Sequence, residues 1–74
     1  MKLPKRIIYD ANIYNTNFIA NHLTTILPFN QRDNIKFSVE YVDHIKHYCI
    51  QIGEDSPDRI YSYIAQDGIT FCYL

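Results

Sequence analysis

Three side chains near the middle of the chain have the types found in a nucleophilic active site: Glu40, His47 and Cys49. His47 and Cys49 are two residues apart in a segment with strand-like alternation, so their side chains share one face. That spacing separates them by ~6.5 Å along a strand, whereas a nucleophile and its base need ~2.6–3.2 Å. We therefore expect no catalysis here, and we interpret Glu40 and His47 as a cross-strand pair that contributes ~0.2–1 kcal/mol.

Metal and cofactor sites are also disfavoured by spacing. His47, Cys49 and Cys72 are candidate zinc ligands, but the chain contains no Cys-x-x-Cys and no His-x-x-x-His pattern. The only two glycines, Gly53 and Gly68, do not form a Gly-rich phosphate loop. We predict a protein that is not an enzyme and that uses no cofactor and no metal.

Length and composition predict a single globular domain spanning residues 1–74. The chain has 74 residues, of which 47% are hydrophobic, as in a folded rather than a disordered protein. A net charge of -1 disfavours nucleic acid as the partner, because proteins that coat duplex DNA usually carry a positive excess. No apolar run is long enough for a signal peptide or a membrane span. We expect a cytoplasmic, host-cell location without membrane association, and reduced thiols.

One helix is predicted over residues 16–27. Ile19, Leu23, Ile26 and Leu27 share one helical face, and polar residues fall on the other. Asn15 or Thr16 can act as the N-cap, and Pro28 ends the helix.

The period changes to two over residues 35–42 and 45–52, which predicts a hairpin turning at Asp43-His44. In this register Val42 lies opposite Ile45 and Phe37 opposite Ile50. One face of the pair is then apolar and the other polar, and a one-residue slip would mix them.

A second hairpin is predicted from strands 59–66 and 69–74, joined by Asp67-Gly68, the strongest turn signal in the chain. This turn places Ile64 opposite Phe71 and Ser62 opposite Tyr73. With sequential strand order, the fold class is α+β: one amphipathic helix packed on a four-stranded antiparallel meander sheet, in two layers. Cys49 and Cys72 then flank Tyr63 from strands two apart, ~9–10 Å from each other, so both should remain thiols.

The sheet face away from the helix carries the candidate partner-binding residues Tyr61, Tyr63 and Leu74. Exposed apolar and aromatic patches tend to be interfaces, which favours a partner or self-association surface. Alternatively, residues 7–9 fold back and cover this face, since a single helix cannot cover both faces. The last strand, residues 69–74, is a candidate edge strand that could pair with another chain.

The loop between the hairpins supplies three further candidate partner-binding residues, Glu54, Asp55 and Asp58. Together with Asp67 they could contact a basic partner, but four acids are too few to argue this strongly, and a solvated loop is the favoured interpretation.

These features favour a small non-enzymatic protein-binding module, such as a phage or mobile-element inhibitor that occludes a host protein. Usage rich in Ile, Asn and Tyr is typical of an AT-rich genome. Two alternatives stay open. One is a homo-oligomeric structural or regulatory protein, dimerising through the sheet face or the last strand. The other is a single-stranded nucleic-acid-binding domain whose sheet tyrosines, Tyr61 and Tyr63, stack on bases.

Overall fold

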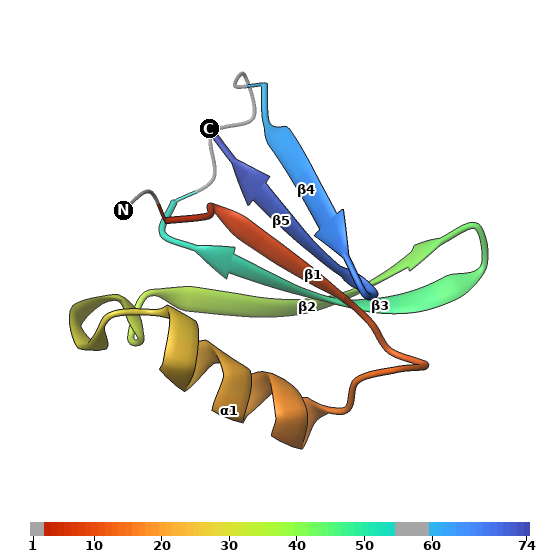
Figure 1. The fold of residues 1–74 in the computed structure, drawn as a ribbon, viewed down its shortest axis with the longest axis horizontal. Coiled ribbons are helices and arrows are strands. Elements are labelled where there is room, and N and C mark those ends of the chain that lie inside the picture. The colour runs from red at the N-terminus through yellow and green to blue at the C-terminus, as the bar shows by residue number, and fades with distance from the viewer. Residues whose placement is uncertain (1–2, 55–59) are drawn as a thin grey trace.

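The computed structural model describes residues 3–54 and 60–74. In chain order the elements are β1 (Arg6–Asp10), α1 (Thr16–Ile26), the 3-10 helix η1 (Phe29–Gln31), β2 (Ile35–Val42), β3 (Ile45–Ile52), β4 (Ser62–Gln66) and β5 (Ile69–Tyr73). The strands form one antiparallel sheet, and α1 lies on one of its faces (Figure 1). The predicted α+β two-layer class is confirmed, with one strand more than expected.

Helix α1 has the boundaries that its capping residues predict. The Asn15 side chain accepts a hydrogen bond of 2.8 Å from the Phe18 N–H, which satisfies a backbone donor that has no partner within the helix. At the other end, the Leu27 N–H donates to the Leu23 carbonyl, and Pro28 follows in extended conformation. The helix therefore ends where the missing N–H of proline prevents another turn.

Both predicted hairpin registers are confirmed. Asp43 and His44 have φ of 52° and 68°, and Asp67 and Gly68 have φ of 53° and 82°; two such residues in succession are the signature of a tight two-residue turn. The pairs Val42–Ile45, Phe37–Ile50 and Ile64–Phe71 are among those observed. Strand β4 begins at Ser62, so its predicted start at Arg59 was too early, and Arg59 itself lies outside the described residues.

Strand β1 lies at the centre of the sheet, which corrects the predicted strand order. The observed order is β2-β3-β1-β5-β4, so β1 separates the two hairpins and pairs with β3 and β5 (Figure 1). Residues 7–9 therefore do not fold back over the reverse face, and β5 is not an edge strand. Central placement gives the β1 backbone hydrogen-bonding partners on both sides, which a strap lying across a sheet would lack.

Burial across the sheet follows this order. One row on the helix side runs Phe37, Ile50, Ile7, Phe71, Ile64, from β2 to β4. Ile7 is fully buried and Ile50 nearly so, whereas the two end residues are 51% and 57% exposed. The core is therefore centred on β1 and its two neighbours, where Ile19, Leu23 and Leu27 from the helical segment join it.

Tyr9 brings a fully buried phenol into this core, and His22 of α1 provides its hydrogen-bonding partner. Tyr9 Oη and His22 Nδ1 share a hydrogen bond of 2.9 Å, and the two rings meet edge to face. His22 is thereby held in a contact within the fold. Burial raises the pKa of Tyr9 to about 12, with a smaller contribution from neighbouring Tyr14.

The central position of β1 leads to a stability prediction. We expect Ile7→Ala to lower the free energy of unfolding by ~2–5 kcal/mol, because it empties a fully buried site between two hairpins. Phe37→Ala, in the same row but half-exposed at the edge, should cost only about 1 kcal/mol. Urea denaturation measures both, and equal losses would contradict the central placement of Ile7.

The raised pKa of Tyr9 leads to a pH prediction. Between pH 10, the ordinary value, and about 12, the unfolded state loses the phenol proton while the folded state keeps it. Stability is therefore intact below pH 10 and falls as the pH rises through this window, by about 2–3 kcal/mol in total.

The Tyr9→Phe variant separates the alkaline loss of stability caused by Tyr9 from the loss caused by Cys72, since burial raises the pKa of both groups. We expect the variant to lose ~1 kcal/mol at neutral pH, because His22 loses its partner, and to show a smaller alkaline decline. Urea denaturation at pH 8, 10 and 11.5 tests this, and parallel declines for the two proteins would argue against it.

Candidate functional site

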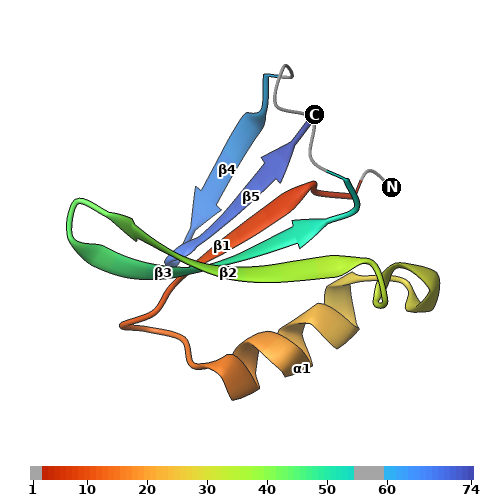
Figure 2. The same ribbon diagram turned by 180° about the vertical axis from the view of Figure 1, so that it is seen from behind.

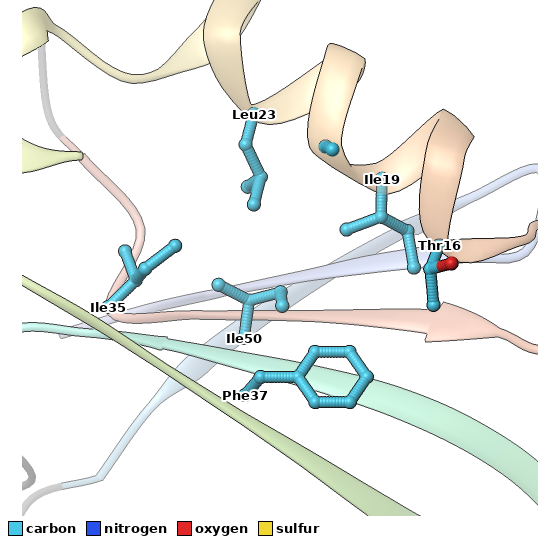
Figure 3. Close-up of a pocket in the computed structure, with 7 residues that line it drawn as sticks. Thr16, Ile19, Leu23, Ile35, Phe37 and Ile50 are labelled. Atoms are coloured by element: carbon cyan, nitrogen blue, oxygen red, sulfur yellow. The ribbon is translucent and has the colours of Figure 1, made fainter. Parts of the chain in front are cut away.

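An open groove lies between α1 and the β2 edge of the sheet. It encloses about 320 Å³ and is almost wholly apolar. Its lining comes from α1 (Thr16, Ile19, Ala20, Leu23), β2 (Ile35, Phe37) and β3 (Ile50). Side chains from the helix point toward those from the strands, with open space between them (Figure 3). We call this feature the α1–β2 groove.

The groove exists because one short helix cannot cover the whole sheet. Eleven helical residues span ~16 Å, and a helix is ~10 Å wide, whereas five strands at ~4.8 Å spacing are about twice as wide. Both views of the ribbon show β4 at the edge of the sheet that lies farthest from α1 (Figures 1 and 2). On the β2 side α1 is close enough to form a groove, yet no residue of β2 is fully buried.

Exposed side chains of β2 extend the groove into a larger apolar surface. Alternation places Val39 and Tyr41 on the same face as Ile35 and Phe37, and Val39 and Tyr41 are 43% and 69% exposed. The Phe37 ring lies 5.4 Å from that of Tyr48 on β3, centre to centre. We call this set, the groove together with Phe37, Val39 and Tyr41, the β2 surface.

The aromatic and apolar binding residues predicted from the sequence lie on β4 and just beyond the ends of β4 and β5. Tyr63 is 65% exposed on the reverse face of β4, opposite Cys72 of β5. Tyr61 and Leu74 lie just outside β4 and β5 and are half-buried. Their role in binding remains a prediction.

The acidic loop is described only at its start. Glu54 is exposed just after β3. Asp55 and Asp58 lie outside the described residues, so the predicted acidic contact with a basic partner also remains a prediction.

The two cysteines are buried on the reverse face and form no disulfide bond, as predicted. They flank β1: Cys49 pairs in register with Ile8, and Cys72 with Arg6. The intervening strand is thus β1 instead of the predicted strand carrying Tyr63. Burial raises the pKa of the Cys72 thiol, Cys49 raises it further, and Arg6 opposes the shift.

Among the residues considered for catalysis or metal binding, His47 is held by a backbone contact. Glu40 and His47 are opposite each other as predicted, but the His47 Nδ1 hydrogen bond, 2.9 Å long, is made with the Ile45 carbonyl. Across residues 3–54 and 60–74, no three His, Cys, Asp or Glu side chains form a group able to hold a metal ion. In the same part of the chain, no helix has the length and apolar character needed to cross a membrane.

Sequence reasoning missed the β2 surface because it assigned the whole apolar face of residues 35–41 to the core. The signal that would have revealed it was the width of the sheet compared with a single helix of three turns. Comparison with protein-family models, with curated proteins and with solved structures finds no match for this chain.

Proposed function

We propose that this chain is a small non-enzymatic protein-binding module that holds its partner on the β2 surface and acts by occluding it. The observation that carries the proposal is the exposure of Phe37, Val39 and Tyr41 beside an apolar groove. Isolated apolar side chains are common on protein surfaces, but a contiguous aromatic and aliphatic patch next to a groove is typical of an interaction site.

The edge position of β2 supports a protein partner over a small molecule. Within the described residues, β2 pairs with β3 on one side and with no strand on the other. Its eight residues contain no proline, so the outer backbone groups can pair with an added strand. An added strand would align its alternate side chains with the groove, combining backbone hydrogen bonds with burial of apolar area.

The finer form of the proposal is an inhibitor encoded by a phage or mobile element and directed at a host protein. Its support is the small size of the fold and the Ile-, Asn- and Tyr-rich composition. The nucleic-acid alternative has less support, because stacking on bases needs exposed rings and Tyr61 is half-buried.

Site-specific photo-crosslinking tests the proposal. A benzoylphenylalanine at position 37 should give defined covalent adducts with a protein in living cells, since the side chain is exposed at the β2 surface. The matched control carries the same group in place of Tyr63, which is exposed on the opposite face. Adducts at position 63 and none at position 37 would instead support the reverse face predicted from the sequence.

Adduct masses identify the partner, and the partner is then purified and titrated against this protein. Val39→Asp should weaken that binding at least tenfold, because it places a charge in the apolar surface. Ala65→Asp, on the reverse side of exposed β4, should leave binding unchanged. An equal effect of the two substitutions would contradict a binding site on β2.

A further inference from the structure

The outer edge of β2 presents the backbone groups of every second residue, and the hydrogen bonds of β3 show which ones. The Ile52 N–H donates to the Lys5 carbonyl, and the Lys46 carbonyl accepts from the Ala11 N–H. The backbone N–H and C=O groups of the even-numbered residues of β3 therefore point toward β1. The backbone groups of its odd-numbered residues therefore point toward β2, and these residues pair in register with residues 36, 38, 40 and 42. The backbone groups of those four β2 residues thus point inward, toward β3. The N–H and C=O groups of Ile35, Phe37, Val39 and Tyr41 consequently point outward.

A second copy of the same edge fits these outward groups in one best register. In an antiparallel pair related by a two-fold axis, outward-facing residues must lie opposite outward-facing residues. All four outward-facing residues form hydrogen-bonded pairs only when Phe37 lies opposite Val39 of the second copy and Ile35 lies opposite Tyr41 of the second copy. Ser38 then lies on the axis, opposite itself, and a shift of two residues either way removes one of the four pairs.

Charge complementarity selects the same register. The two charged side chains of β2, Lys36 and Glu40, lie on the reverse face four residues apart. With Ser38 on the axis, Lys36 of each copy faces Glu40 of the other, which makes two opposite-charge pairs per dimer. Shifting by two residues places Lys36 opposite Ser38 or Val42 instead. Charges on an edge strand usually discourage pairing, whereas this spacing favours pairing with an identical strand.

We propose that the partner of the β2 surface is a second copy of this chain, joined edge to edge through β2 in the register centred on Ser38. This inference rests on the part of the proposed function that makes the β2 surface a protein-binding site, and it assigns that site to self-association in place of occlusion of a different protein. The two five-stranded sheets form one continuous ten-stranded sheet, and both α1 helices lie on the same face. Phe37 and Val39 of the two copies pack at the seam between the grooves.

The other edge is a poorer candidate for self-pairing. Strand β4 has five residues and no charged side chain, so it offers fewer backbone pairs and no electrostatic selection of register. Pairing of β2 with β4 of a neighbour would not close into a dimer and would continue into a filament.

Charge reversal tests the register. We expect sedimentation equilibrium over a concentration series to show a dimer for the wild-type chain. Lys36→Glu and Glu40→Lys, made separately, each create two like-charge pairs and should each weaken the dimer about tenfold. The double variant restores both opposite-charge pairs and should recover wild-type association. Circular dichroism confirms that all variants are folded.

A disulfide probe tests the position of the axis. Two Ser38 residues in a non-hydrogen-bonded pair have Cα atoms ~4.5 Å apart, within the range of a disulfide. Ser38→Cys should therefore give a covalent dimer when copper–phenanthroline oxidises the two thiols. Ser62→Cys on β4 is the matched control and should not. Cys49 lies opposite residue 38 in the β2–β3 register, within disulfide range, so both cysteine variants are made on a Cys49→Ala background that removes this competing thiol. The native Cys72 is buried and should not cross-link.

The outcomes separate this inference from the proposed function. A wild-type monomer at high concentration, or a dimer that neither responds to charge reversal nor forms the Ser38→Cys cross-link, overturns the self-pairing inference. If position 37 then yields adducts with a different protein, the β2 surface is still a binding site and only its occupant was wrong. If position 37 yields no adduct of either kind, the proposed function fails as well.

Discussion

Strand β1 holds the fold together because it supplies the only direct pairing between the two hairpins in the described sheet. β2 and β3 form one ladder and β4 and β5 another, and each hairpin pairs with β1 along one side. An isolated hairpin is marginally stable in water, so neither would persist without the strand between them. Ile7 and Tyr9, which have no exposed surface, place the core directly over this junction.

The central position of β1 also fixes where the surface is left open. Since β1 directly precedes α1 in the chain, the helix returns over the middle of the sheet, and its buried residues meet β1, β3 and β5. The edge strands receive little cover from it. On the β2 side this produces the groove and the exposed Phe37, Val39 and Tyr41. The proposed binding surface is therefore a direct consequence of the strand order.

Local features of this fold could be predicted from the sequence, whereas the long-range ones could not. The Asp67-Gly68 turn and the alternation in residues 35–52 determine their hairpins through neighbouring residues, and both registers are as predicted. The position of β1 depends on which of several partners best satisfies Ile7, Ile8 and Tyr9. Three successive apolar residues are typical of a strand buried on both faces, but they do not indicate which strands lie beside it.

The candidate site shows the same division. The exposure of Tyr63 followed from alternation alone, and the structure agrees. Tyr61 and Leu74 lie just beyond the ends of strands, where alternation does not predict exposure, and both are half-buried. The thiol prediction for Cys49 and Cys72 was right although the intervening strand was wrong, because any strand placed between them keeps them too far apart for a disulfide.

Polar groups and exposed apolar groups are distributed differently in this fold. Several groups that could do chemistry have contacts within the fold. The Tyr9 hydroxyl is hydrogen-bonded to His22, and the His47 ring to a backbone carbonyl. The two thiols are buried. On β2, Ile35 packs against the core, whereas folding leaves about half of the Phe37 surface and more of the Tyr41 surface in water. A domain of this size buries a small core, so apolar side chains left in water are a sizeable part of the area that it could bury. The exposure of Phe37, Val39 and Tyr41 on an edge strand is what the proposed association would account for.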